Sequence, residues 1–460
     1  MQIVVCVRQG RDGELSPFDA CAYEAALRIP NATVTLVSMG PEKTGNLLLR
    51  LTRLGAQKAI LLCDRAFAGA DTLATAYTLS LAIEKLHPDL ILCGRQTLEG
   101  DTAQVGPMLS VLAGYQLITN AMTLQAGDAG VTCTTRDEGD MTAAYPALVT
   151  VERINTLRLP SIRSKVGTVE MWNAEMLGAD VEKCGLTGSP TRVLSSKQNE
   201  AGKRRCTFIT ADKLAEAIQT GLEKNTARAA DTEVAAVKLP LVCTVGDDPR
   251  AFAETVGETV TVLEKSDADT LITEITALDP DAVIWGSDAW SKRVAAVVCA
   301  KMGLGLCADC TKLDADGETL FMIRPALSGS VIAKIKSITR PAMATVRTVT
   351  AAKDVVVCAG FGAKDDMDTV RDFAQKYNAE LAATRRMVDN GILPYAAQVG
   401  LTGRTVAPPL YIALGVSGAV HHIVGMQQAG TVIAVNPDKQ APIFDYADFG
   451  IVGDIDTVLS

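Results

Sequence analysis

Short runs of apolar and β-branched residues alternate with helical patterns along the N-terminal part of this chain. The strand-like runs are 2–7, 33–40, 58–64 and 90–96. The helical patterns between them are 17–28, 41–54 and 71–86. Continuous apolar strands separated by helices are typical of a parallel sheet that is covered on both faces. We therefore expect a doubly wound α/β fold, on which ligands bind at the carboxyl ends of the strands.

The sequence then repeats this plan. The segment PDLILCG (88–94) is echoed by PDAVIWG (280–286), and YPALVTVE (145–152) is echoed by RPAMATVR (340–347). Both echoes lie almost the same distance further along the chain, which chance alone rarely produces. We therefore predict two similar copies of one α/β module, near 1–190 and 236–350.

A third α/β unit follows residue 350. Strand-like runs at 354–360, 410–417 and 431–438 accompany a helical pattern near 364–378. The segment 192–237 is polar and charged, with one amphipathic helix pattern at 211–225, so we place a boundary near 226–237. We predict three doubly wound, mostly parallel-sheet, Rossmann-like domains and one connection, with these bounds: a nucleotide-binding domain at 1–191, a linker and helical arm at 192–235, a second domain at 236–350 and a third at 351–460.

Composition excludes several classes of partner. The net charge is −9 at pH 7, so we expect no binding to nucleic acid or to an anionic membrane surface. No apolar run reaches the roughly 18 residues that a membrane span needs. The first residues, MQIVVCV, form a strand pattern in place of the basic and apolar regions of a signal peptide. We therefore expect a cytoplasmic protein.

The twelve cysteines are scattered along the chain, and most fall in apolar strand patterns. Dispersed cysteines of this kind are usually reduced and buried. The one CxxC motif is Cys307-Ala-Asp-Cys310, which has no second pair and no histidine close to it in sequence. We interpret both cysteines as packing residues, with a redox or zinc role as the alternative. We assign no metal ligand and no catalytic residue.

Polar residues follow the strands of the third unit and predict a dinucleotide site. A strand that runs into Ser417-Gly418-Ala419 and then a helix offers backbone N–H groups to a phosphate. Small residues there let a pyrophosphate approach closely. Ordinary turns and helix caps are the alternative interpretation. Side-chain donors, acceptors and charges are available from Gln398, Thr402, Asn436, Arg385 and His422.

These segments carry a resemblance to a known family. Residues 354–456 closely resemble the FAD domain of the electron transfer flavoprotein alpha subunit, in QVGLTGRTVAPPLYIALGVSGAVHHIVGM (398–426) and APIFDYADFGIVGD (441–454). Residues 282–347 resemble the N-terminal domain of that subunit, in GLCADCTKLDADG and RPALSG. Residues 1–191 resemble the beta subunit, in VCVRQ, SPFDACAYEAAL, VSMGP, DRAFAGADTLATA, CGRQTLEGDTAQVGP, LRLPSIRSK and GSPT. The chain is thus similar to a beta subunit fused to an alpha subunit, and the likeness of those two folds accounts for the repeat.

The resemblance implies one FAD in the C-terminal domain. Arg385 would lie over the flavin ring, Thr402 near its N5 and His422 beside its O2. A reduced flavin carries negative charge at N1–O2, so a cation and donors there would tune its potential. Thr384 takes the place of the family's usual serine, and Phe18 would approach the flavin from the beta-like part. The pyrophosphate and adenosine would meet Ser417, Gly418, Ala419, Asn436 and Asp454, and the other expected contacts are Gln398, Val399, Gly400, Gly403, Thr405, Val406 and Asp438.

The beta-like part is expected to bind a second nucleotide. The family's beta subunit binds AMP in one group and a second FAD in another group, which performs electron bifurcation with NADH. The segments GADTLATA and GDTAQVGP resemble the bifurcating group. Asp71 and Thr72 are also good N-cap residues, and capping needs no ligand. The residues implied at this site are Cys6, Val7, Ser38, Met39, Gly40, Asp71, Thr72, Thr75, Gly94, Gln96, Gly100, Asp101, Thr102, Gln104 and Val105.

Several positions depart from the family pattern. The stretch 10–15 replaces a proline-aspartate segment and a long hairpin, which puts part of the flavin or NADH pocket in doubt. Leu401 stands where the family has glutamine, and Phe361 where it has arginine. The loop near 157–168 keeps Ile162 as an apolar anchor but lacks the usual lysine run.

The resemblance implies an electron carrier that uses FAD. Its donor would be a flavoprotein dehydrogenase of the acyl-CoA dehydrogenase type that docks near Ile162. With bifurcation, NADH would be oxidised and ferredoxin or flavodoxin would become partners. The alternatives are a carrier with one FAD and a structural AMP, and a nucleotide-binding protein without redox chemistry.

Overall fold

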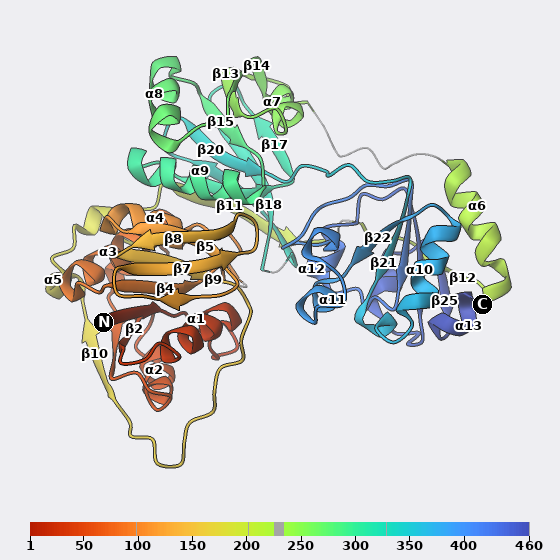
Figure 1. The fold of residues 1–460 in the computed structure, drawn as a ribbon. Coiled ribbons are helices and arrows are strands. Elements are labelled where there is room, and N and C mark those ends of the chain that lie inside the picture. Colours follow the sequence, from red (N-terminus) through yellow and green to blue (C-terminus); the bar gives the residue numbers. More distant parts are fainter. Residues whose placement is uncertain (98, 201, 225–233, 328, 460) are drawn as a thin grey trace. The chain divides into compact units, whose positions relative to one another are not determined.

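The computed structural model describes residues 1–460 except 98, 201, 225–233, 328 and 460 (Figure 1). It divides into two compact units. The N-terminal unit comprises Met1–Ser196, Val234–Leu327 and Ala333–Val346. The C-terminal unit comprises Lys197–Glu233, Ser328–Ile332 and Arg347–Ser460. Among the helices of the described residues, none combines the length and the apolar character that a bilayer span requires.

The first module of the N-terminal unit is built on a ten-stranded sheet. Its order is β10-β3-β2-β1-β4-β9-β5-β7-β6, with β8 paired to β7. Strands β1 to β4 are parallel and match the four predicted runs. The bounds are β1 (Gln2–Cys6), β2 (Thr33–Met39), β3 (Lys58–Leu62), β4 (Leu90–Gly94), β5 (Gln116–Ala121), β6 (Gln125–Ala126), β7 (Gly130–Thr135), β8 (Gly139–Ala144), β9 (Ala147–Val151) and β10 (Thr168–Trp172).

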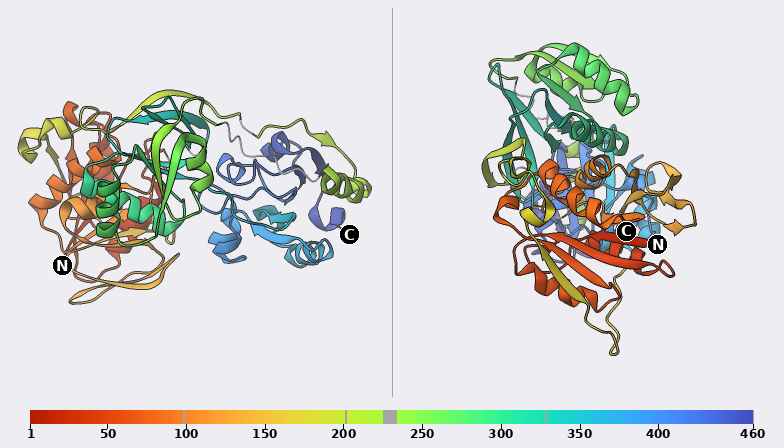
Figure 2. Two further views of the ribbon diagram at one scale, coloured as in Figure 1. Left: turned by 90° about the horizontal axis from the view of Figure 1, so that it is seen from above. Right: turned by 90° about the vertical axis from the view of Figure 1, so that its left-hand side faces the viewer.

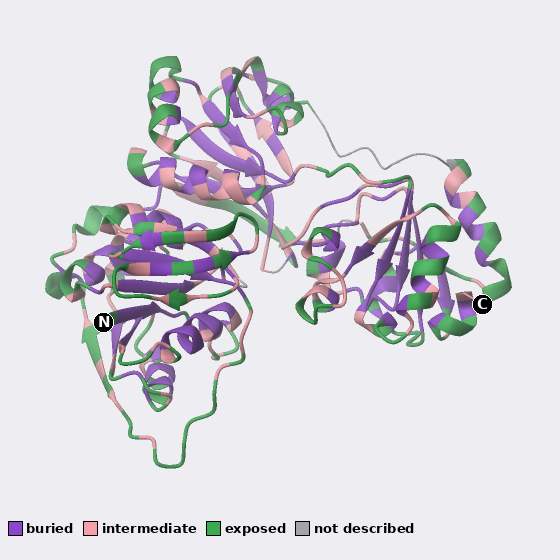
Figure 3. Ribbon diagram, in the orientation of Figure 1, coloured by how far each residue is buried: buried purple, intermediate pink, exposed green. Residues whose placement is uncertain are grey.

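Helices cover both faces of this sheet (Figure 1; Figure 2). Successive residues of a strand point to opposite faces, so Ile3 and Val5 pack with α1 and α2, whereas Val4 and Cys6 pack with α3 and α4. The buried strands run between helices whose outer faces are exposed (Figure 3). The bounds are α1 (Pro17–Leu27), α2 (Thr44–Thr52), α3 (Thr72–Leu86), α4 (Val105–Ala113) and α5 (Ala174–Leu177).

The second module repeats the arrangement on a parallel five-stranded sheet of order β14-β13-β15-β20-β16. The two echoed sequences form adjacent parallel strands in both modules: β4 pairs with β9, and β15 pairs with β20. The predicted fold class is therefore confirmed. The bounds are β13 (Leu239–Val245), β14 (Gly257–Leu263), β15 (Ala282–Trp285), β16 (Leu306–Cys310), β20 (Ala342–Val346), α7 (Arg250–Val256), α8 (Ala268–Leu278) and α9 (Ala289–Met302).

The two modules share one hydrophobic core. Helix α4 packs on α9, and a single cluster joins Met108 of the first module to Val298 and Trp285 of the second. A separate four-stranded sheet has the order β11-β19-β18-β17. Its bounds are β11 (Thr191–Gln198), β17 (Lys312–Ala315), β18 (Leu320–Ala326) and β19 (Val331–Ser337).

The C-terminal unit has a six-stranded parallel sheet of order β12-β25-β24-β23-β21-β22. Val355 and Val357 face one apolar cluster, and Val356 and Cys358 face another, so both sides of the sheet are buried. The bounds are β12 (Thr207–Phe208), β21 (Val355–Ala359), β22 (Glu380–Ala383), β23 (Leu410–Leu414), β24 (Thr431–Asn436), β25 (Phe449–Val452), α6 (Leu214–Lys224), α10 (Met367–Lys376), α11 (Arg385–Asp389), α12 (Val420–Ile423) and α13 (Ile455–Leu459).

Where the structure describes it, the segment predicted as a linker and helical arm, 192–235, contributes β12 and α6 to the C-terminal unit. β12 pairs with β25, and the buried Arg204 guanidinium donates to the carbonyls of Ala429 and Gly430 and pairs with Asp448. Helix α6 buries Ile218 in the core of the C-terminal unit. The polar composition of the segment 192–235 reflects a short edge strand and the outer face of an amphipathic helix. The boundary predicted near 226–237 falls largely on 225–233, outside the described residues.

Candidate functional site

The C-terminal unit has a topological switch point at the carboxyl ends of β21 and β23. β22 lies on one side of β21 and β23 on the other, so the direction of strand order reverses here, as at nucleotide sites of open α/β sheets. The loops that follow β21 and β23 meet backbone to backbone. A Cβ on Gly360 would lie 2.1 Å from the carbonyl oxygen of Gly415.

The turn from β23 into α12 forms a cradle that excludes side chains. Gly418 has φ +87°, and a Cβ there would lie 2.1 Å from the backbone nitrogen of Ile443. Ser417 is exposed and Ala419 is half-buried, so the backbone of this turn stays open to a ligand. The helix that follows is one turn, Val420–Ile423. Phosphate binding here would therefore depend on individual N–H groups, because a helix of one turn has little dipole.

The loop at 398–406 contains an unpaired buried acceptor. Gln398 Nε2 donates to Thr402 Oγ1 over 2.7 Å, while the buried Gln398 Oε1 has no hydrogen-bond partner among the described residues. Arg347 fixes the loop by donating to the carbonyl oxygens of Gly400 and Leu401 and to Thr405 Oγ1. Val399 and Val406 are buried, and a Cβ on Gly403 would lie 2.3 Å from the Gln398 carbonyl oxygen. An acceptor without a partner and a turn that admits no side chain, both in loops of this sheet, fit a bound dinucleotide such as FAD.

His422 is buried and neutral, and its one ring proton is used within the protein. Its Nδ1–H donates to the Val399 carbonyl oxygen (3.0 Å), so Nε2 is unprotonated and accepts from the Tyr411 hydroxyl (3.1 Å). Burial lowers the pKa of His422 to about 4. The sequence pattern could not reveal this because the shift comes from tertiary burial.

We expect His422 to make the C-terminal unit less stable as the pH falls from 6.5 to 4. Its folded pKa of about 4 lies below the ordinary value of 6.5, so the unfolded chain binds a proton that the folded chain does not. The loss from this residue approaches about 3 kcal/mol at pH 4. Urea unfolding across this window should show a flatter pH profile for His422→Gln than for the wild type. Parallel profiles would contradict the assignment of a neutral buried imidazole.

The other predicted FAD-site residues lie at the same edge of the sheet. Thr384 precedes α11 without making a side-chain cap, and Arg385 Nε pairs with Asp389 Oδ2 at 3.2 Å. Asn436 shapes the turn after β24, since Oδ1 accepts from the Asp438 N–H and Nδ2 donates to the Val416 carbonyl oxygen. Asp454 is exposed after β25.

A departure from the family pattern is matched by a neighbouring arginine. The guanidinium carbon of Arg386 lies 3.8 Å from the centroid of the Phe361 ring. Phe361 follows β21 and Arg386 belongs to α11. Phe361 replaces the family's arginine, and the positive charge of Arg386 lies over its ring.

The residues predicted for the second nucleotide gather around β1, β2 and β4. The strand order reverses between β1 and β4, which places Cys6, Val7 and Gly94 at the switch point. Burial raises the pKa of Cys6 to about 12, so this thiol is neutral and packs in the core. The buried Ser38 Oγ, beside Met39 and Gly40, has no hydrogen-bond partner among the described residues.

Several of these polar side chains bind one another. Asp71 caps α3 through the N–H groups of Leu73 and Ala74 and also accepts from Thr191. Thr72 donates to Gln104, and Gln96 donates to Asp101. The capping interpretation of Asp71 therefore describes this geometry without a ligand. The remaining predicted residues are Thr75 in α3, Gly100 and Thr102 between β4 and α4, and Val105 at the start of α4.

Sequence reasoning missed two buried carboxyl groups beside this site. Asp19 accepts from the N–H groups of Arg8 (2.9 Å) and Gly94 (3.1 Å), and burial raises its pKa to about 7. Glu152, directly after β9, pairs with Arg95 and Arg136. In the sequence Asp19 resembles any first-turn helix acid, and Glu152 is 57 residues from Arg95. No local signal could have identified either.

Two further predicted residues lie in the N-terminal unit. Phe18 is 1% exposed, packed within α1 beside Gly94, and its approach to a flavin stays a prediction. Ile162 is fully exposed in the loop that leads to β10.

Comparison with known proteins identifies the family. The model described as "Electron transfer flavoprotein domain" matches residues 3–176 and 259–366, and "Electron transfer flavoprotein FAD-binding domain" matches 349–427. The electron transfer flavoprotein subunit beta of Clostridium acetobutylicum is 37% identical over 205 residues, which cover 42% of this chain and 79% of that subunit. The subunit beta of Megasphaera elsdenii is 39% identical over 206 residues, covering 41% and 76%.

An alpha subunit matches as well. The electron transfer flavoprotein subunit alpha of Thermoanaerobacterium thermosaccharolyticum is 33% identical over 227 residues, which cover 39% of this chain and 69% of that subunit. Similarity to a beta and to an alpha subunit within one chain is consistent with a fusion of the two. The chain belongs to the electron transfer flavoprotein family and carries its FAD-binding domain at the C-terminal end.

Proposed function

We propose that this protein carries electrons through an FAD held in the C-terminal unit. Its donor is a flavoprotein dehydrogenase of the acyl-CoA dehydrogenase type, and it delivers electrons to a separate redox acceptor. The observation that carries the proposal is the cradle at Gly418 together with the unpaired Gln398 Oε1, at the switch point of the FAD-binding domain. When bound, FAD takes up and releases electrons in one- or two-electron steps.

The protein's own residues bind and orient the cofactor in this proposal. Ser417, Gly418 and Ala419 present backbone N–H groups to the pyrophosphate, and Arg347 holds the 398–406 loop in place. Arg385 supplies the cation near the flavin, because His422 is neutral and its Nδ1–H is committed to Val399. Asn436 keeps the turn after β24 in shape beside the adenosine.

The first module binds a second nucleotide, FAD or AMP, in the same proposal. Its support is the switch point between β1 and β4, where Ser38 Oγ has no hydrogen-bond partner among the described residues. A second FAD would accompany NADH-dependent bifurcation to ferredoxin or flavodoxin, as the GADTLATA and GDTAQVGP segments favour. AMP would make the protein a carrier with one redox centre.

We expect the purified chain to release FAD on denaturation. A known amount of protein is unfolded, and the released FAD, AMP and NAD are separated by chromatography. Two FAD per chain with bleaching by NADH would support bifurcation. One FAD and one AMP without bleaching would support the plain carrier. A nucleotide without an isoalloxazine ring would contradict electron transfer and favour a non-redox nucleotide-binding protein.

Docking of the dehydrogenase near Ile162 is part of the proposal. The side chains of Ile162 and Leu159 are 100% and 89% exposed in the loop at 157–168, and such apolar side chains commonly anchor protein partners.

A further inference from the structure

The two cysteines of the CxxC motif lie in contact inside the second module. Cys307 and Cys310 are 3% and 0% exposed, and their sulfur atoms are 3.6 Å apart. In a straight strand residues i and i+3 point to opposite faces and lie about 10 Å apart. The contact therefore requires a distortion of β16.

Asp309 provides that distortion. It has φ +54°, in the left-handed region that a non-glycine residue rarely adopts, and the pairing of β16 with β20 is irregular between Cys307 and Cys310. The conformation is held by the ion pair with Lys292 (2.8 Å) and by the Asp309 N–H, which donates to Thr345 Oγ1 (2.8 Å). Backbone strain of this kind persists where surrounding contacts over-determine it, often at functional sites.

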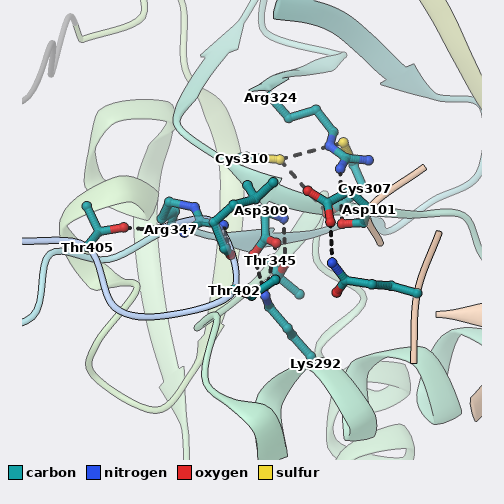
Figure 4. Close-up of polar contacts among 12 residues, drawn as sticks. Asp101, Lys292, Cys307, Asp309, Cys310, Arg324, Thr345, Arg347, Thr402 and Thr405 are labelled. Atoms are coloured by element: carbon teal, nitrogen blue, oxygen red, sulfur yellow. Dashed lines mark hydrogen bonds and ion pairs between the residues drawn. The ribbon is translucent and has the colours of Figure 1, made fainter. Parts of the chain in front are cut away.

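A buried arginine faces the two sulfur atoms. Arg324 is 6% exposed and lies beside Cys307 and Cys310 (Figure 4). Its Nη2 donates to the carbonyl oxygens of Gly100 and Asp101. The hydrogen bond from the Cys310 S–H, with the charge of Arg324, lowers the pKa of Cys307, whereas burial raises the pKa of Cys310. The thiolate form of Cys307 is thus favoured, and Cys310 keeps its proton. This is the arrangement of a nucleophilic thiol and a resolving thiol.

We propose that Cys307 and Cys310 form a reversible intrachain disulfide when the protein meets a hydroperoxide. The Cys307 thiolate attacks one oxygen of hydrogen peroxide, which gives a sulfenic acid on Cys307 and releases hydroxide. Cys310 then attacks the Cys307 sulfur, forms the S–S bond and releases water. Two thiols and one peroxide become one disulfide and two waters, so atoms and electrons balance.

Trypsin isolates the two cysteines in one fragment. Cleavage after Lys301 and Lys312 yields 302–312, which contains only these two cysteines. Cleavage after Arg293 and Lys301 yields 294–301 with Cys299, and cleavage after Lys238 and Arg250 yields 239–250 with Cys243. Both are buried single thiols, and burial raises the pKa of Cys243 to about 11, so they are matched internal controls.

The test uses the full chain with its cofactor. The protein is reduced, freed of reductant, exposed to hydrogen peroxide, denatured with an alkylating reagent and digested. We expect fragment 302–312 to lack alkyl groups and to be lighter by two hydrogens, in a fraction roughly tenfold above the oxidised fraction of Cys243. Dithiothreitol should restore both alkylation sites. Two alkylated thiols under conditions that oxidise Cys243 would overturn the proposal.

Single variants separate the two roles. In Cys310→Ser a sulfenic acid should accumulate on Cys307 and react with dimedone, because no resolving thiol remains. In Cys307→Ser, Cys310 should stay as unreactive as Cys243. Equal oxidation of the remaining thiol in both variants would contradict the assigned order. Thermal unfolding, with Cys243→Ser as the matched core substitution, reports whether the variants fold; if they do not, the wild-type fragment decides alone.

Discussion

Gly418→Ala should weaken FAD binding by about two orders of magnitude in Kd, equivalent to roughly 3 kcal/mol. The purified protein should therefore contain less FAD. A Cβ at this position would lie 2.1 Å from the nitrogen and 2.5 Å from the Cα of Ile443, which are backbone atoms that cannot rotate away. The turn must therefore shift and withdraw its N–H groups from the proposed pyrophosphate position. Absorbance of the flavin released on denaturation, and titration of the apoprotein with FAD, measure the effect.

Gly391→Ala is the matched control. Gly391 also has a positive φ, +70°, but a Cβ there would meet nothing within 4 Å. The substitution carries the conformational penalty of alanine without the steric clash, so FAD content should match that of the wild type. Equal FAD loss in both variants would assign the effect to general destabilisation. Unchanged FAD binding by a folded Gly418→Ala protein would exclude this turn from the site.

Glu152→Gln should lower the free energy of unfolding of the N-terminal unit by about 3–5 kcal/mol. Glu152 is fully buried, and its Oε1 lies 2.7 Å from Arg95 Nη1 and 3.3 Å from Arg136 Nη1. The two arginine side chains are 9% and 6% exposed. A neutral amide of the same shape removes the negative charge that these two buried guanidinium groups share. Urea unfolding of the reduced protein at neutral pH measures the loss.

A surface pair supplies the control for this second prediction. Glu170 pairs with Lys58 at 3.5 Å, and both side chains are more than a third exposed. Glu170→Gln should change the free energy of unfolding by less than about 1 kcal/mol, because water screens the pair. Similar losses in both variants would contradict the role assigned to buried charge.

The fold was predictable where buried parallel strands make the sequence continuously apolar. Strands β1 to β4, β21, β23 and β24 fall within the predicted runs, ending up to three residues earlier. The echoed segments form β4 and β9 in one sheet and β15 and β20 in the other. The same apolar pattern recurs because these strands occupy equivalent buried positions in both modules. The pairing of β12 was not predictable, because β12 is a two-residue edge strand whose partner β25 lies far away in the chain.

The segments that form the candidate site were predictable from the sequence, but the protonation states of its buried residues were not. The loops after β22, β23 and β24 meet at one sheet edge, as the rule for parallel sheets requires. The neutral state of His422, the raised pKa of Asp19 and the pairing of Glu152 with two arginines depend on burial and on partners distant in sequence.

The amino-acid sequence by itself determined the α/β class, the duplicated module and the position of the FAD-binding domain, because local periodicity and short motifs encode them. Only the tertiary structure decided which buried groups carry charge and which side chains touch. The Cys307-Ala-Asp-Cys310 spacing is compatible with sulfur atoms on opposite faces of a strand. The left-handed backbone of Asp309, held by Lys292 and Thr345 from other elements, brings them together. Desolvation and long-range contacts exist only once the chain has folded, so no local pattern can report them.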